Sequence, residues 1–298
     1  MDLSGKIDVV ENISEQAFRK NYLNLQKPLV MKGLAYNEVA GRKWSIPYFK
    51  STMGEFAIDV FDNGNKKTAG SAFTKPDLKM KFKDFLDVIS KDEPSSLRMF
   101  LFNLFKYNPE LKKEFPCPRF FRGLLSGMAY MFFGGKNTTV RIHQDIDMSH
   151  VLHTHFGGRK RVVLIAPEYS TLLYRLPLNT YSLVNLDKPD YKTYPALQFI
   201  KGAEVILEPG DSIFMPAGYW HYMTYLEGSF SASYRKLPNA LYVLCGIRNL
   251  VIFLPLDKAL NKLLGKHWLG IKVRIAKKRA ERVMNKNRMP YFDDALGI

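Results

Sequence analysis

The stretch RIHQDIDMSHVLHTHFGGRKR, residues 141 to 161, holds four of the chain's six histidines together with two aspartates. Within it, His143 and Asp145 are two residues apart, so both side chains leave the same face of an extended strand. Such a His-x-Asp pair can hold a metal ion, but it also occurs on surfaces and in hydrogen-bonded cores. The pair decides nothing alone, and a further ligand has to come from elsewhere in the chain.

The segment EPGDSIFMPAGYWHYM, residues 208 to 223, supplies that ligand. Residues 209–211 predict a tight turn, 212–215 a short apolar strand, and 216–218 a bend that delivers His221 into the next strand. Two histidines and one carboxylate on one side of an ion form the facial triad of non-haem Fe(II) oxygenases, which leaves positions open for a cosubstrate and O2. We therefore predict His143, Asp145 and His221 as metal ligands and as the catalytic centre.

The predicted secondary-structure pattern changes at two places along the chain. Residues 1–126 alternate helical and apolar strand patterns, with helices expected after Ser14, near Ser45 and over 80–91, and strands over 27–34, 56–61 and 96–105. From about 127 to 236, short β-rich segments are separated by Gly, Pro and Asn turns, as in a barrel or jelly-roll, and beyond 238 the pattern is helical. We expect a mainly β double-stranded β-helix with an α/β lead-in and a helical C-terminal extension.

The motifs HQD, GRKR and PGDSIFMPAGYWH resemble those of the cupin-like JmjC proteins, the group that includes the asparaginyl hydroxylase acting on hypoxia-inducible factor. The segments QKPLVMKGLA, KWSIPYFKSTMGEFAIDVF and FLFNLFKYNPEL extend the resemblance over roughly residues 7 to 237. It implies a cupin-like JmjC domain over 1–237, followed by a basic helical extension over 238–298. It also implies Fe(II), 2-oxoglutarate and O2 as cofactors and cosubstrates.

The resemblance also implies roles in binding 2-oxoglutarate. Lys160 matches the lysine that pairs with the distal carboxylate of 2-oxoglutarate, which suits an ammonium on a strand beside the metal strand. Thr139 and Ser233 are the further cofactor-binding residues that we expect. His153 and His155 share a strand face and are expected to line the core or the pocket. Four positions depart from the family pattern and put the usual binding mode in question: Phe100, Val140, Val151 and Ser233.

Charge is concentrated at the C-terminus. Residues 239–298 hold 12 Lys plus Arg against 4 Asp plus Glu, within a chain of formal net charge +16. The two cysteines form no disulfide framework and no signal peptide is recognised, so we expect a cytoplasmic protein. The apolar run 241–256 carries Arg248 and falls short of the roughly 20 residues that span a bilayer, so a transmembrane segment is not expected.

The stretch DKALNKLLGKHWLGIKVRI reads as one amphipathic helix. Its apolar stripe opposes a lysine face at Lys258, Lys262 and Lys266; the stripe consists of Leu260, Leu264, Trp268, Ile271 and Ile275. Such a stripe suits packing on the barrel, a homodimer through the C-terminal helices, or peripheral contact with an anionic membrane. Nucleic acid is a weaker candidate, because interleaved exposed aromatic residues are missing.

Two function hypotheses follow. The first is an Fe(II)- and 2-oxoglutarate-dependent hydroxylase acting on an unidentified substrate, which could be a protein side chain, a small molecule, a lipid or RNA. The second is a non-catalytic or otherwise-reacting metal-binding module that engages an anionic partner through its basic C-terminus.

Overall fold

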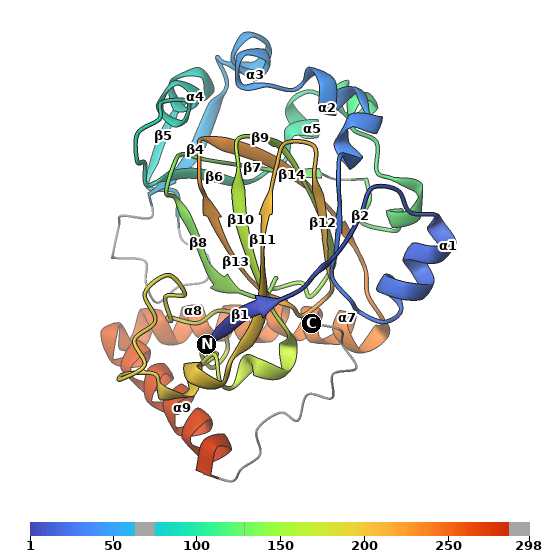
Figure 1. Cartoon of the computed structure of the whole chain (residues 1–298). Coiled ribbons are helices and arrows are strands. Elements are labelled where there is room, and N and C mark those ends of the chain that lie inside the picture. Colours follow the sequence, from blue (N-terminus) through green and yellow to red (C-terminus); the bar gives the residue numbers. More distant parts are fainter. Residues whose placement is uncertain (63–74, 128, 286–298) are drawn as a thin grey trace.

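The computed structural model describes residues 1–62, 75–127 and 129–285. Two β-sheets face each other and enclose the interior of the molecule (Figure 1). The first sheet has the order β1 (Asp2–Gly5), β11 (Lys201–Leu207), β10 (Lys160–Ile165), β13 (Trp220–Tyr225), β8 (Thr139–His143). The second has the order β2 (Asp8–Val10), β3 (Leu29–Met31), β12 (Ser212–Met215), β9 (His150–Gly157), β14 (Ser229–Lys236), β7 (Ala129–Gly134), β6 (Leu97–Phe102), β4 (Ala57–Asp62), β5 (Leu78–Lys81).

From β7 to β10 the chain alternates between the two sheets, and from β11 to β14 it does so again. The central strands pair antiparallel: β10 lies between β11 and β13, and β14 lies between β9 and β7. This double crossing is the double-stranded β-helix of jelly-roll proteins, so the predicted fold class is confirmed.

The N-terminal lead-in extends both sheets. Its strand β1 joins the first sheet, and β2, β3, β4, β5 and β6 join the second. Hydroxyl side chains start two of its helices: Ser14 accepts from the Ala17 amide and Ser45 from the Tyr48 amide. The lead-in helices are α1 (Glu15–Phe18) with η1 (Arg19–Leu23), η2 (Leu34–Asn37), α2 (Val39–Lys43), α3 (Ile46–Met53), α4 (Phe82–Ile89), α5 (Leu104–Tyr107), α6 (Leu111–Glu114) and η4 (Arg119–Phe121). The helices and strands expected in this region are therefore present.

Two apolar clusters pack against the sheets, and the second also extends between them. One packs aromatic side chains of the lead-in, including Phe18, Phe49 and Phe82, against the second sheet. The other packs the segment 166–200, with its short helices η5 (Pro167–Ser170) and η6 (Pro195–Phe199), and α9 (Lys266–Asn285) against the first sheet. The inner faces of the sheets also carry buried polar and titratable residues, including His153, His155 and Lys160.

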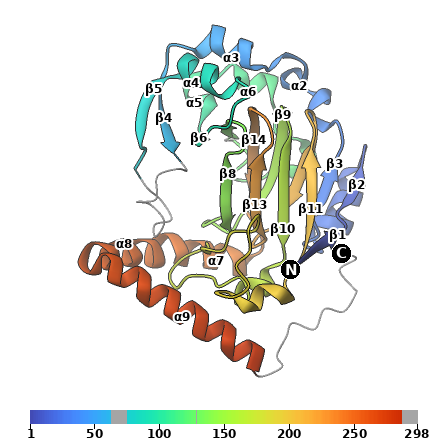
Figure 2. The same cartoon turned by 60° about the vertical axis from the view of Figure 1, so that its left-hand side comes forward.

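The C-terminal region is helical, as expected, although the division at residue 238 into two units stays a prediction. Helix α7 (Ala240–Arg248) runs through a π-helical turn, η7 (Asn249–Phe253), into α8 (Leu254–Leu264). Gly265, with φ of 52°, ends that run and α9 follows, so the single helix expected over this region is two. Figure 2 shows α7 and α8 crossing one end of the barrel, with α9 beneath them.

The expectation about membrane-spanning length is wrong. The helical run Ala240–Leu264 has 25 residues and is long and apolar enough to cross a membrane by length and composition. The helix is longer than the apolar run 241–256, because α8 continues past Asp257 and Lys258 to Leu264.

A buried ion pair joins the two C-terminal helices to the barrel. Asp257 of α8 accepts hydrogen bonds from Trp268 Nε1 at 2.7 Å and from Lys272 Nζ at 2.9 Å, both in α9. Asn179 Nδ2, in the segment that covers the first sheet, donates to the same carboxylate at 2.9 Å. Lys272 is fully buried. This network fixes α8 and α9 to each other and to the domain.

Candidate metal centre

Three predicted ligands meet inside the barrel. His143 ends β8, Asp145 follows in the next loop, and His221 lies near the start of β13. His143 and His221 are paired across the strand ladder, and their ring centroids are 4.1 Å apart. Ligand atoms of the two rings and of the Asp145 carboxylate all lie within 4.8 Å of one another, a spacing that one ion can bridge.

Backbone carbonyls orient both imidazoles. Nδ1 of His143 lies 2.7 Å from the carbonyl oxygen of Arg141, and Nδ1 of His221 lies 3.3 Å from that of Tyr219. When Nδ1 donates to a carbonyl, the other ring nitrogen carries the free lone pair. Both rings are thereby held in the tautomer that offers Nε2 to a metal.

The protonation states also suit a cation. Burial, and then the charge of His221, lowers the pKa of His143 to about 3, and burial lowers that of His221 as well. Burial alone would raise the pKa of Asp145, but the charge and the hydrogen bond of Arg235 outweigh it and hold the pKa below its usual range. Two neutral imidazoles and an ionised carboxylate are the donor set that non-haem Fe(II) takes.

Arg235 of β14 is a positioning residue that the sequence did not indicate. Its Nη2 lies 2.9 Å from Oδ1 of Asp145, and its Nη1 lies 2.7 Å from Oδ1 of Asp147. Ser149 Oγ also accepts from Nη1, at 2.9 Å. Since the guanidinium is bonded to Oδ1 of Asp145, it limits rotation of this carboxylate. Asp147, two residues further along the same loop, helps to hold Arg235.

Lys160 starts β10 and is fully buried. Its ammonium donates to Ser231 Oγ, lies 3.3 Å from His153 Nε2, and sits 4.3 Å from the ring centroid of Tyr225. Burial lowers the pKa of Lys160 to about 7. Each of these partners is neutral, so the charge of the Lys160 ammonium has no counter-charge among them. The carboxylate of a bound ligand would supply it.

The comparisons agree with this geometry. The sequence model of the cupin-like domain matches residues 15–235, more than half of the chain. The chain belongs to the cupin-like family. It is 28% identical to zebrafish (Danio rerio) lysine-specific demethylase 8, covering 74% of this chain and 56% of that protein. It is 26% identical to zebrafish tRNA wybutosine-synthesizing protein 5, covering 81% of this chain and 79% of that protein. Against lysine-specific demethylase 8 of Xenopus tropicalis the identity is 27%, over 74% of this chain and 50% of that protein.

The cupin-like chain thus spans about half the length of the demethylases that it matches. The predicted family is confirmed, while the relation to the asparaginyl hydroxylase stays a prediction. JmjC members of the family are oxygenases that use Fe(II) and 2-oxoglutarate. The triad and the buried ammonium of Lys160 fit these two groups.

The other predicted cofactor residues lie in different places. Ser233 Oγ lies 2.7 Å from His153 Nδ1, so it faces the interior but is engaged by a histidine. The side chain of Thr139 hydrogen-bonds to the hydroxyl of Tyr222. Tyr222 and His221 are consecutive in β13, so their side chains point to opposite faces of the sheet. A register shift between β13 and β8 turns Thr139 to that outer face. Its role in binding 2-oxoglutarate stays a prediction that the geometry does not favour.

Two further histidines of the cupin-like domain line the interior beside Lys160, as expected. His153 bridges Ser233 and Lys160, and its pKa is lowered by burial and by the Lys160 charge. His155 contacts Ser231 Oγ at 3.3 Å and the Gly158 carbonyl at 2.9 Å. Both are neutral polar groups next to the place where the cosubstrate carboxylate is expected.

Arginines add positive charge near the triad. The charge of Arg98, on β6, makes a small contribution to the lowered pKa of His143. Burial, together with the charge of Arg141, lowers the pKa of Arg98 itself. The Cζ atom of Arg98 lies 4.6 Å from the ring centroid of Phe100, one of the four positions that depart from the family pattern. At this position the chain therefore pairs a cation with an aromatic face.

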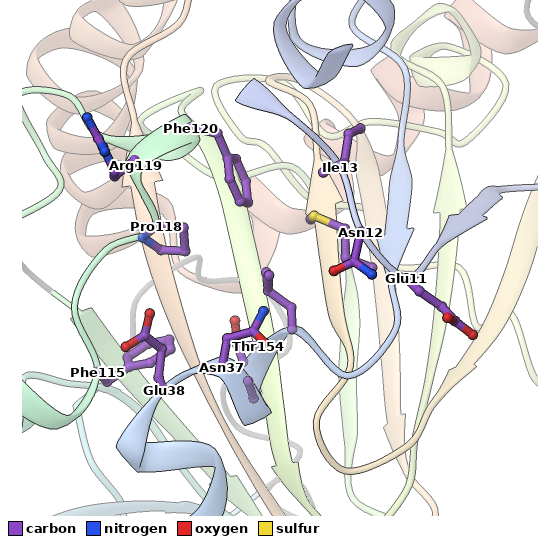
Figure 3. A pocket seen from close by; sticks show the side chains of 13 residues that line it. Glu11, Asn12, Ile13, Asn37, Glu38, Phe115, Pro118, Arg119, Phe120 and Thr154 are labelled. Atoms are coloured by element: carbon purple, nitrogen blue, oxygen red, sulfur yellow. The ribbon is translucent and has the colours of Figure 1, made fainter. Parts of the chain in front are cut away.

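A separate pocket of about 240 Å³ lies away from the metal centre (Figure 3). Its walls include Glu38, Arg119, Phe120 and Thr154. Thr154 lies between His153 and His155 in β9, so its side chain points to the opposite face of the second sheet. None of the triad lines this pocket, and we assign it no part in the iron chemistry.

Proposed function

We propose that the chain is an Fe(II)- and 2-oxoglutarate-dependent hydroxylase. The observation that carries the proposal is a pairing inside one barrel: a His-Asp-His donor set within 4.8 Å and a fully buried lysine whose hydrogen-bond partners are neutral. The first feature suits Fe(II) and the second suits the distal carboxylate of 2-oxoglutarate. A purely structural metal site would have no use for the buried ammonium.

With Fe(II) and 2-oxoglutarate bound, O2 would be used to form succinate, CO2 and a hydroxylated substrate. The chain supplies the arrangement for this chemistry. His143, Asp145 and His221 hold one side of the ion, Arg235 fixes the carboxylate, and the backbone carbonyls fix the rings. Lys160 orients the cosubstrate, and the surrounding buried side chains, such as Tyr225, exclude water.

Family membership selects the reaction class and not the substrate. The names of the relatives point to protein lysine in one case and to tRNA in another. A protein side chain, a small molecule, a lipid and RNA are therefore the substrate classes to be screened, with succinate release as the common readout.

Anaerobic titration tests the proposal. Adding 2-oxoglutarate to the Fe(II)-loaded protein should produce the weak visible charge-transfer absorption of a chelated 2-oxo acid. Asp145→Asn should abolish this band, because the amide is a poor replacement for the anionic ligand. Asp87→Asn is the control, since Asp87 is an exposed carboxylate on α4 that pairs with Lys50, and this variant should retain the band.

The same titration separates the rival hypothesis. A metal-binding module without cosubstrate chemistry would bind Fe(II) but give no band with 2-oxoglutarate and no succinate in air. That result, in a folded protein that binds the ion, would overturn the hydroxylase proposal.

A further inference from the structure

In the helical run Ala240–Leu264, polar or small residues face the protein and many large apolar residues face outward. Its three buried positions are Gly246, Asn249 and Asp257, while its large apolar residues face outward. Leu244 is 64% exposed, Val251 66% and Leu263 78%. The other exposed apolar residues of this run are Leu241, Ile247, Leu250, Ile252, Leu256 and Leu264. A helix that covers a soluble core shows the reverse arrangement, so this outward face is built to meet an apolar medium.

The buried polar residues hold this run along the surface of the domain. Asn249 Nδ2 donates to the carbonyl of Ile146 at 3.1 Å, and Asp257 is bound by Asn179, Trp268 and Lys272. A Cβ on Gly246 would lie 2.3 Å from the carbonyl oxygen of Asp147, so glycine allows the close approach of the helix to that loop. The polar side of the run is thus satisfied by the protein.

Positive charge gathers beside the apolar face. The Nε of Arg248 is buried without a hydrogen-bond partner. Burial, and then the charges of Arg248 and Arg279, lowers the pKa of Arg175. Within the part of the chain that the structure describes, no carboxylate pairs with any of these three arginines. Further exposed basic residues follow on α9, namely Lys266, Arg274, Lys278, Arg279 and Arg282. Anions are therefore the ligands that this cluster lacks.

We propose that the run Ala240–Leu264 lies in the interface of an anionic membrane, with its apolar face among the acyl chains and Arg175, Arg248 and Arg279 on lipid phosphates. An apolar face flanked by basic residues is the pattern of helices that lie in the membrane plane. Crossing the bilayer would instead place Asn249 and Asp257 in hydrocarbon and break their bonds to the domain. The protein is therefore a peripheral one.

Docking in this way places the metal centre beside the lipid surface. Asn249 bonds to Ile146, and Gly246 contacts Asp147, so the run packs directly on the loop that carries Asp145. The proposal does not depend on the hydroxylase chemistry, because vesicle binding can be measured without iron or 2-oxoglutarate.

Vesicle co-sedimentation tests the proposal with three proteins. The wild type should bind vesicles of phosphatidylcholine mixed with phosphatidylglycerol at low salt and bind pure phosphatidylcholine weakly. The double variant Leu244→Asp, Val251→Asp should lose binding, and Leu124→Asp should keep it, because Leu124 is 89% exposed but lies outside the run. Arg279→Gln, at the exposed one of the three arginines, should weaken binding about fivefold, with the effect fading at high salt.

Each contrary result has a clear meaning. Absence of binding to the anionic vesicles at low salt, or unchanged binding by the double variant, overturns the membrane assignment. So does a wild type that sediments as a dimer and becomes a monomer with Leu244→Asp and Val251→Asp, since the face would then be covered by a second copy. Membrane-bound protein that resists extraction by high salt and alkaline carbonate would show a spanning helix and overturn the peripheral arrangement.

Discussion

Nη2 of Arg235 lies 2.9 Å from Oδ1 of Asp145. Arg235 belongs to β14 and Asp145 to the loop after β8, 90 positions earlier in the sequence. The same guanidinium binds Asp147, so one arginine fixes the loop that carries the central ligand. Residues of this kind set ligand orientation around protein metal sites and influence affinity without touching the ion.

Replacing Arg235 should weaken metal binding. Arg235→Gln removes the charge that keeps Asp145 ionised and frees the carboxylate to rotate, so we expect a loss of about 10- to 100-fold in Fe(II) affinity. Competition with a chelator measures it. The control is Lys236→Gln, at the neighbouring position, where Nζ donates instead to the Arg122 carbonyl. Equal affinities of Arg235→Gln and the wild type would refute this role.

The affinity for 2-oxoglutarate should fall as pH rises above 7. Burial lowers the pKa of Lys160 to about 7, so the ammonium is increasingly neutral above that value in the protein without cosubstrate. A bound carboxylate needs the charged form, so binding takes up a proton and the affinity drops about tenfold per pH unit. Calorimetric titration in buffers of different ionisation enthalpy measures both quantities.

Arginine provides the control for that titration. Lys160→Arg keeps its charge throughout, so its affinity, even if lower, should not depend on pH in this range. A wild type whose affinity is flat from pH 7 to about 9 would show that the Lys160 ammonium does not bind the cosubstrate.

Acid should destabilise the fold through His150. Burial, and then the charge of Lys236, lowers the pKa of His150 to about 4, and its Nδ1 accepts from the Ala217 amide at 3.0 Å. A depressed folded-state pKa means that the stability is full above the unfolded value of 6.5 and is lost as pH falls toward 4. The expected loss is about 1.4 kcal/mol per pH unit between these values. Urea unfolding of the wild type and of His150→Gln measures it, and parallel pH profiles would contradict the assignment.

The buried ion pair between Lys272 and Asp257 should matter for stability. Lys272→Met leaves the Asp257 carboxylate buried without its cation, so the free energy of unfolding should fall by about 3 kcal/mol. Lys278→Met is the matched control, because Lys278 is exposed on the same helix, and it should change stability little. If both variants unfold at the same denaturant concentration, the pair does not anchor α9.

Local patterns predicted the fold and the triad, because strand periodicity and the His-x-Asp spacing are properties of neighbouring residues. Lys160 was placed by resemblance and lies in the interior as expected. Arg235 was missed, since nothing near it in sequence reports a partner 90 positions away. The face on which Thr139 lies depends on a register shift between β8 and β13 that no sequence period encodes, and its role in binding 2-oxoglutarate stays a prediction.

For the C-terminal helices, too, local sequence patterns predicted some features, while others depend on contacts between distant residues. Their helicity and charge follow from composition, but the break at Gly265 and the burial of Asp257 do not. Asp257 and Asn249 face inward to partners on other segments, and several apolar residues between them, such as Val251 and Ile252, are exposed. The homodimer and the cytoplasmic location stay predictions.

Release of succinate from 2-oxoglutarate in air, with Fe(II) and a reductant present, tests the central claim most directly. The wild type should form succinate and CO2 in equal amounts even without substrate, at a slow rate, while His143→Ala and Asp145→Asn should form none above background. His267→Ala should match the wild type, because this histidine is exposed on α9. Succinate formation by either triad variant at the wild-type rate, or none by a wild type that binds Fe(II) and 2-oxoglutarate, would contradict the account.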